Sequence, residues 1–276
     1  MINNHSKHVL NYFNIGHFIE TGTYMGETLM KVKSWDFNGS IDAVEIEKEY
    51  CQISATWNIL AALELIDGRP IYDTTYSINW LINSAAKLSK LIYDDEDTRN
   101  KYINLQKQII FEKEKWDLYK IAKNCELNCI GDHRLEVEKI KNFNIHLSDT
   151  RRYLEKILPN HKNKNTFFYL DAHWDENDYP LLEELELLSS ISHLTPIIAI
   201  DDFKTPGKAF GYDHYKNAIC GADYIKDTVK DVTDTIYCCP NSNMHNRGQG
   251  FIFYNRNKKD IQTFLDKYPF IEIPIK

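Results

Sequence analysis

Polar side chains that can bind a ligand follow five short apolar runs of the sequence. Ligands of an open parallel sheet bind outside the carboxyl ends of its strands, so a site is expected directly after each run. Many of these residues are carboxylates, which repel one another at close range unless a cation or hydrogen-bond donors balance them. We therefore expect one functional edge, formed by Glu20-Thr21-Gly22-Thr23, Glu45, Ser148-Asp149, Asp171-Ala172-His173 and Asp201-Asp202.

The stretch FIETGTYMGETL, residues 18–29, places glycines where the backbone turns sharply and lets a ligand approach the amides of a helix. It is not the G-x-G-x-x-G dinucleotide fingerprint, because Gly22 and Gly26 are too far apart. Glu45 ends the next apolar run, where a carboxylate can accept hydrogen bonds from two ribose hydroxyls. Each feature alone is common in strand ends that bind nothing. Together they predict a ligand that contains a nucleoside.

Three aspartates form the second half of the predicted site. Asp171 ends one apolar run, and Asp201 and Asp202 end the next. Carboxylate oxygens are the ligands that a hard divalent cation such as Mg²⁺ prefers, so the three predict a metal site. The alternative is that Asp201-Asp202 only caps the turn that follows.

Aromatic residues near this edge are candidates for contact with a substrate, although such rings are as often part of a core. They are Tyr24, Trp174, Tyr179 and Tyr212. Further options, which the sequence does not rank, are His214, His245 and Arg247.

The apolar runs alternate with longer amphipathic stretches, which is the pattern of a parallel sheet covered by helices. The chain therefore predicts an α/β fold with a doubly wound sheet. A helix is expected at 179–191, and the last two strands are expected to form a hairpin pair. The predicted strands are residues 17–20, 41–46, 143–148, 166–172, 196–202, 235–239 and 250–255.

One interval between the predicted strands is too long for a single crossover helix. Residues 60–140 contain charged amphipathic stretches that predict two or three helices. We interpret them as a helical insertion within a single domain that spans residues 1–276. The insertion is a lid, an acceptor-recognition module or a dimerisation arm, and the last of these would make the protein a homo-oligomer.

Composition limits the classes of partner. The 276 residues are 43% hydrophobic and 26% charged, and they contain no apolar run long enough to span a bilayer. The opening MINNHSKHVLNYFN lacks the apolar core of a signal peptide, so we expect a cytoplasmic protein whose six cysteines are reduced thiols. The formal charge of -7 argues against nucleic acid as the main partner and favours a small molecule, in particular a carbohydrate.

Five blocks of the chain, in order, are FIETGTYMGETL, AVEIE, HLSDTRRYL, FFYLDAHW and PIIAIDDF. Together they resemble class I S-adenosylmethionine-dependent methyltransferases over residues 15–60 and 140–255. The resemblance implies a Rossmann-like sheet of seven strands with the last one antiparallel. It also implies which residues bind S-adenosylmethionine: Glu20, Thr21, Gly22, Thr23 and Gly26 around the methionine part, Glu45 at the ribose, and Ser148 and Asp149 at the adenine.

The resemblance is closest to bacterial sugar and small-molecule O-methyltransferases of the macrocin type. In that family three aspartates at corresponding strand ends hold Mg²⁺, and an aspartate two residues after the first acts as the base. The resemblance thus assigns Asp171, Asp201 and Asp202 to the metal, and Asp171 also to the cofactor and to catalysis. The base position holds His173 instead. A neutral imidazole can take a proton from a hydroxyl near pH 7, so His173 is the candidate general base, although it is also open as a metal ligand.

The sequence therefore predicts an S-adenosylmethionine-dependent O-methyltransferase that acts on a hydroxyl of a sugar, a nucleotide sugar or another small polar metabolite, assisted by a divalent metal. One alternative is a metal-dependent glycosyltransferase, because D-x-H after a strand can hold a metal bound to a nucleotide diphosphate. That alternative leaves the combination of the glycine turn with Glu45 unexplained. A second alternative is a non-catalytic nucleoside-binding protein. Amino-methylating enzymes of nucleic acids are disfavoured, because DAHW replaces their N/D-P-P-Y/F motif.

Overall fold

The structure is a computed structural model, and it describes most of the chain outside a long interval between residues 47 and 143. The described residues are 2–24, 26–35, 37–47, 143–161, 165–172, 179–191, 194–215 and 218–276, with 54, 96–97, 99–101 and 103–104. The chain divides into two compact units. The first holds Met1–Gly22, Asn38–Ile46 and Ser148–Lys276, and the second holds Thr23–Phe37 and Glu47–Leu147. The predicted insertion at 60–140 lies almost entirely outside the described residues and stays a prediction.

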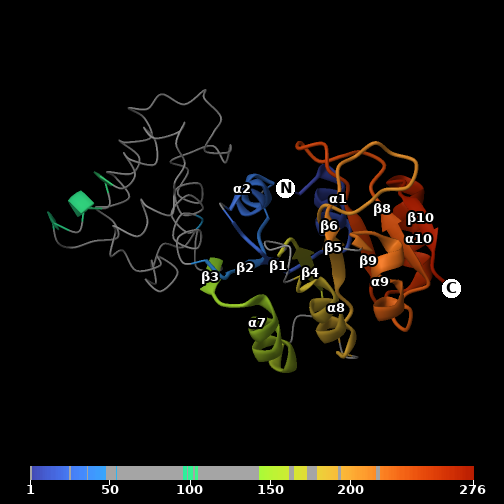
Figure 1. The fold of residues 1–276 in the computed structure, drawn as a ribbon, viewed down its shortest axis with the longest axis horizontal. Coiled ribbons are helices and arrows are strands. Elements are labelled where there is room, and N and C mark those ends of the chain that lie inside the picture. The colour runs from blue at the N-terminus through green and yellow to red at the C-terminus, as the bar shows by residue number, and fades with distance from the viewer. Residues whose placement is uncertain are drawn as a thin grey trace. The chain divides into compact units, whose positions relative to one another are not determined.

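Strands and helices alternate along much of the chain, as expected for an α/β fold (Figure 1). The helices are α1 (Asn4–Tyr12), α2 (Glu27–Ser34), α7 (Thr150–Ile157), the 3-10 helix η3 (Leu158–Asn160), α8 (Leu181–Ser189), α9 (Ala222–Val229) and α10 (Lys258–Lys267). The strands are β1 (His17–Thr21), β2 (Ser40–Glu45), β3 (Phe143–Leu147), β4 (Thr166–Leu170), β5 (Ile197–Ile200), β6 (His214–Tyr215), β7 (Ala218–Ile219), β8 (Thr235–Cys238), β9 (Gly250–Phe253) and β10 (Ile271–Pro274). All seven predicted strands are present, and α8 confirms the predicted helix.

The main sheet is doubly wound around β1. In the first unit its strands follow the order β10-β8-β9-β5-β4-β1-β2. β1 pairs in parallel with β2 on one side and with β4 on the other, and β4 pairs in parallel with β5. The chain therefore builds the sheet outward from β1 in both directions. The boundary between β1 and β4 is the topological switch point, outside which such sheets bind their ligands.

The last strands of the sheet depart from the parallel pattern. β9 runs antiparallel to both β5 and β8, which confirms the predicted pairing of 235–239 with 250–255. β10 then pairs antiparallel with β8 at the sheet edge. Including β3, the sheet has eight strands, so the predicted count of seven is wrong. The additional strand ends at Pro274, and a proline without an N–H group is tolerated in an edge strand.

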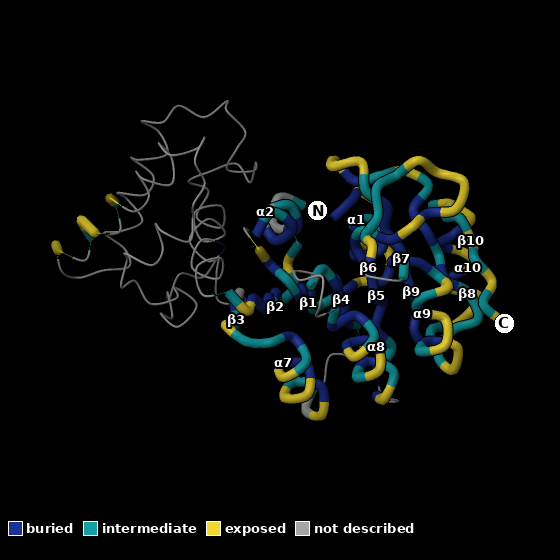
Figure 2. The backbone as a smooth tube through the Cα atoms, in the orientation of Figure 1, coloured by how far each residue is buried: buried dark blue, intermediate teal, exposed yellow. Residues whose placement is uncertain are grey.

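Helices cover both faces of the sheet in the first unit, as strands buried on both sides require. α7, α8 and α9 lie side by side along one face, where Leu185 and Ile225 join the core (Figure 1). On the other face, α1 and α10 pack through Phe13 and Phe264 against Phe253 of β9, with ring centroids 5.2–5.9 Å apart. β4 is buried at all five positions in the middle of these layers (Figure 2).

Two further expectations concern the environment of the chain. Every helix within the described residues is too short or too polar to cross a membrane. Cys220, Cys238 and Cys239 are buried and carry free thiols, as expected for reduced cysteines.

Candidate functional site

Gly22 marks a very close approach between the ends of β1 and β4. Its φ angle is +72°, and a Cβ atom built on it would lie 2.4 Å from the backbone oxygen of Asp171. The N–H of Asp171 donates to the carbonyl of Thr21 at 3.0 Å, and the N–H of Gly22 donates to the carbonyl of Val44 at 3.0 Å. Only a residue without a side chain fits here. The sequence predicts that Gly22 lets a ligand approach, but the close packing of the two strand ends already requires a glycine here.

Buried polar side chains surround this point. Glu20 at the end of β1 is 1% exposed, and Glu45 at the end of β2 is 6% exposed. The N–H of Ser148 donates to the carbonyl of Glu45 at 3.0 Å, which brings the segment after β3 to the end of β2. The hydroxyl of Thr21 is buried and has no hydrogen-bond partner among the described residues. Buried carboxylates and an unsatisfied hydroxyl at a switch point fit a polar ligand such as S-adenosylmethionine.

The carboxylate of Asp149 already has hydrogen-bond and ion-pair partners within the protein. Its carboxylate caps α7 by accepting a hydrogen bond from the N–H of Arg151 at 2.9 Å, and it forms an ion pair with the Arg151 guanidinium at 2.6 Å. The hydrogen bond from the Arg151 side chain is the largest cause of the lowered pKa of Asp149. Arg151 also reaches Glu183 of α8 at 2.9 Å. A contact of Asp149 with adenine would therefore share the carboxylate with the N-terminus of α7.

Three predicted site residues belong to the second unit. The N–H of Gly26 donates to the carbonyl of Thr23 at 2.9 Å, and Gly26 has a φ angle of +78°. Tyr24 also has a positive φ angle, +48°, and is 43% exposed. The segment is a tight turn before α2, as the glycine spacing predicts. Its contacts with cofactor and acceptor stay predictions.

Asp201, the first aspartate after β5, is buried among neutral hydrogen-bond donors. It is 1% exposed and accepts from Nε2 of Gln249 at 2.8 Å and from Nδ2 of Asn243 at 3.4 Å. The same Gln249 nitrogen lies 2.6 Å from Oη of Tyr169. Burial raises the pKa of Tyr169, and the nearby charges of Asp201 and Asp171 raise it further, so the phenol stays protonated. These donors offset the cost of burying the carboxylate.

Asp202, in contrast, is balanced by a cation. Its φ angle is +51°, and its Oδ1 accepts from Nε of Arg247 at 2.6 Å. Nη2 of Arg247 donates to Asp213. Burial alone lowers the pKa of Arg247, but the hydrogen bonds and charges of Asp202 and Asp213 raise it overall. Arg247 is therefore a permanent cation that ties the loop after β5 to the connection between β8 and β9.

These contacts bear on the predicted Mg²⁺ ligands Asp171, Asp201 and Asp202. Mg²⁺ demands near-octahedral oxygen ligands, whereas Arg247 already occupies an oxygen of Asp202 and amides already bond Asp201. Within the described residues, no group of three or more His, Cys, Asp or Glu side chains is arranged to hold a metal ion. The described side chains thus do not fit the predicted ligand set. His173 lies outside the described residues.

The predicted acceptor-contacting aromatics have different surroundings. Tyr179 packs on Tyr215 with ring centroids 3.9 Å apart and lies against the core, which is the alternative role given to such rings above. Tyr212 lies 4.9 Å from the ring of His214 and 5.4 Å from Nζ of Lys204. Trp174 falls among 173–178, for which the structure gives no description. Tyr212 thus lies between two exposed polar side chains.

The sequence alone does not identify the residues that hold the β5 carboxylates. It offers Arg247 only as an unranked candidate, and it does not single out Gln249, Asn243 or Tyr169. One signal was present, because a tyrosine in the apolar run just before Asp171 needs a partner for its hydroxyl. The identity of that partner was not readable, since Gln249 lies 80 residues further along the chain.

Comparison with known proteins gives remote structural likenesses. No protein-family model and no curated protein sequence matches the chain. The O-methyltransferase TomG from Streptomyces achromogenes, involved in tomaymycin synthesis and solved with SAM, is 9% identical with a TM-score of 0.44, over 93% of this chain and 82% of TomG. The methyltransferase domain of bacterial CtHen1-CN is 10% identical with a TM-score of 0.38, over 90% of this chain and 98% of that domain. At these values the likeness carries no argument about activity.

Replacement of Gly22 by alanine is expected to lower the free energy of unfolding by about 3 kcal/mol or more, because backbone strain and a clash with Asp171 add. Gly207→Ala is the matched control, since Gly207 has a φ angle of +70° but nothing within 4 Å of the added Cβ. It should cost only about 1–2 kcal/mol. Urea unfolding measures both, and equal losses would contradict the close approach.

Replacement of Gln249 by leucine is expected to destabilise the protein by about 2–4 kcal/mol, because it removes a donor from the buried carboxylate of Asp201. Asn241→Leu, at an exposed position of the same connection, should change stability by no more than about 0.5 kcal/mol. The comparison uses urea unfolding at neutral pH. A loss for Gln249→Leu as small as that of the control would remove Gln249 as a support of Asp201.

Proposed function

We propose that the protein is an S-adenosylmethionine-dependent O-methyltransferase whose cofactor binds outside the carboxyl ends of β1, β2 and β4. The observation that supports this most is the pair of buried glutamates, Glu20 and Glu45, at adjacent strand ends beside the switch point. In doubly wound folds, an acidic residue after the second strand accepts hydrogen bonds from a ribose. Glu45 has this position.

The cofactor carries its methyl group on a positively charged sulfonium and supplies an electrophilic carbon. In the proposed site, Glu20 and the backbone around Gly22 face its methionine part, and Ser148 and Asp149 face its adenine. The acidic character of the edge suits a ligand with a cationic centre. Thr23 and Gly26 complete the methionine side in this proposal.

The acceptor is proposed to be a hydroxyl of a sugar, a nucleotide sugar or another small polar metabolite, approaching from the side of Asp171 and Tyr212. His173 takes the hydroxyl proton while the new C–O bond forms and the C–S bond of the cofactor breaks. The proposal assigns no step to a metal ion, because Arg247 already balances Asp202. A lid, an acceptor-recognition module and a dimerisation arm all stay open as proposed roles of the insertion at 60–140.

Calorimetry with S-adenosylmethionine tests the cofactor half of the proposal. The wild type should bind it, and Glu45→Gln should bind about ten- to a hundredfold more weakly, because charge-assisted hydrogen bonds to the ribose are lost. Glu155→Gln, on the exposed side of α7, should bind like the wild type. Addition of Mg²⁺ or of EDTA should leave the affinity unchanged. A wild-type protein that does not bind the cofactor would refute the methyltransferase proposal.

An activity assay distinguishes a methyltransferase from a glycosyltransferase and from a binding protein. The protein is incubated with cofactor labelled in its methyl group and with a panel of sugars and nucleotide sugars. Methyl transfer to an acceptor supports the proposed reaction. Release of a nucleoside diphosphate from a nucleotide sugar without methyl transfer would indicate a glycosyltransferase. Cofactor binding without any transfer would indicate a binding protein.

A further inference from the structure

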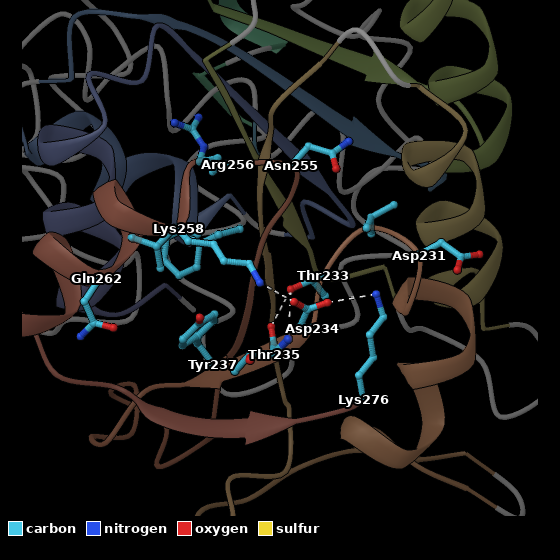
Figure 3. A pocket seen from close by; sticks show the side chains of 13 residues that line it. Asp231, Thr233, Asp234, Thr235, Tyr237, Asn255, Arg256, Lys258, Gln262 and Lys276 are labelled. Atoms are coloured by element: carbon cyan, nitrogen blue, oxygen red, sulfur yellow. Dashed lines mark hydrogen bonds and ion pairs between the residues drawn. The ribbon is translucent and has the colours of Figure 1, made fainter.

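A polar pocket lies at the end of the sheet opposite the proposed cofactor site. It is formed where β8 begins, where the antiparallel β9 ends and where α10 begins. Its volume of about 480 Å³ is in the range of small-molecule sites. The lining residues all belong to the first unit and include Asp234, Tyr237, Asn255, Arg256, Lys258 and Lys276 (Figure 3).

Two lysines of this pocket share one carboxylate. Nζ of Lys258 lies 2.6 Å and Nζ of Lys276 lies 3.0 Å from the carboxylate oxygens of Asp234 (Figure 3). The hydrogen bonds from Lys258 and Lys276 lower the pKa of Asp234 to about 2, so this carboxylate stays ionised at neutral pH. Two ammonium groups thus face one carboxylate. The other acidic residue of the lining, Asp231, is exposed to solvent.

Arg256 is the third cation of the pocket, and Figure 3 shows its side chain apart from the lysine cluster. Nε and Nη2 of Arg256 are buried and have no hydrogen-bond partner among the described residues. The guanidinium carbon lies 4.9 Å from the ring centroid of Phe13, which contacts only the face of the group. Burial lowers the pKa of Arg256 to about 10, although the nearby charge of Asp260 acts in the opposite direction, so the group is still charged at neutral pH. A buried charged donor without an acceptor is costly, and a bound anion would offset that cost.

We propose that this pocket binds a small oxyanion, the phosphate or carboxylate group of a polar metabolite, held by Arg256 and Lys258. A guanidinium presents parallel N–H donors that match two oxygens of such a group. The positive end of the α10 dipole, at Lys258, adds to the attraction. Tyr237 and Asn255 line the same pocket and offer neutral donors. The site is independent of the proposed methyl transfer, since none of its residues lies at the carboxyl ends of β1, β2 or β4.

Titration of the full chain with inorganic phosphate, phenyl phosphate, acetate and benzoate, followed by amide NMR shifts, tests the proposal. Saturable binding with shifts at residues 231–237 and 253–262 is expected, with a dissociation constant in the range of about 0.1–1 mM. Arg256→Gln should weaken binding by at least about tenfold, and Lys258→Gln by about threefold. Arg152→Gln, an exposed arginine of α7, should bind like the wild type.

The titrations distinguish support for the proposed anion site from evidence against it. A preference for the phosphates or for the carboxylates identifies the group, and either supports the proposal. The proposal is overturned if none of the four anions saturates the wild type, or if Arg152→Gln loses as much affinity as Arg256→Gln. Should Arg256→Gln fail to fold, Lys258→Gln decides, because its side chain is 87% exposed and its removal leaves the core intact. An unchanged affinity of Lys258→Gln then overturns the proposal.

Discussion

The backbone oxygen of Asp171 lies where a side chain at residue 22 would begin, only 2.4 Å from an ideal Cβ atom. The N–H of Asp171 donates to the carbonyl of Thr21 and so links the ends of β1 and β4, and the hydrogen bond from Gly22 to Val44 adds the end of β2. Three strand ends are thereby fixed at one edge. The buried carboxylates of Glu20 and Glu45 lie at two of these strand ends, so their positions depend on how the ends are held. The proposed cofactor site therefore depends on Gly22, which the backbone of the sheet requires.

Charge is balanced differently at the two ends of the sheet. After β5, the side-chain amides of Gln249 and Asn243 donate to Asp201, and Arg247 neutralises Asp202. At the opposite end, one pocket is lined by three cations and by the carboxylates of Asp231 and Asp234, and Nε and Nη2 of Arg256 are buried without a hydrogen-bond partner among the described residues. We propose a ligand with a cationic centre beside Glu20 and Glu45, and an anion at the opposite end of the sheet.

Much of the sheet could be predicted from the sequence because its strands are buried on both faces and read as continuous apolar runs. β4, written TFFYL, is an example. β10 was missed because IEIP is short, alternates in burial and contains proline, which the sequence pattern demotes. The charge balance of the site was not predictable, since Asp202 meets Arg247 across 45 residues and Asp201 meets Gln249 across 48. Residue types showed where carboxylates gather, but only the fold shows which donor each one has.

A crystal structure of the full chain with S-adenosylmethionine would show where the cofactor binds. We expect the cofactor outside the carboxyl ends of β1 and β4, with its ribose hydroxyls about 2.5–3.0 Å from the carboxylate of Glu45. We also expect Arg247 to keep its ion pair with Asp202 in the complex. A cofactor bound elsewhere, or a ribose out of reach of Glu45, would contradict the proposed cofactor site.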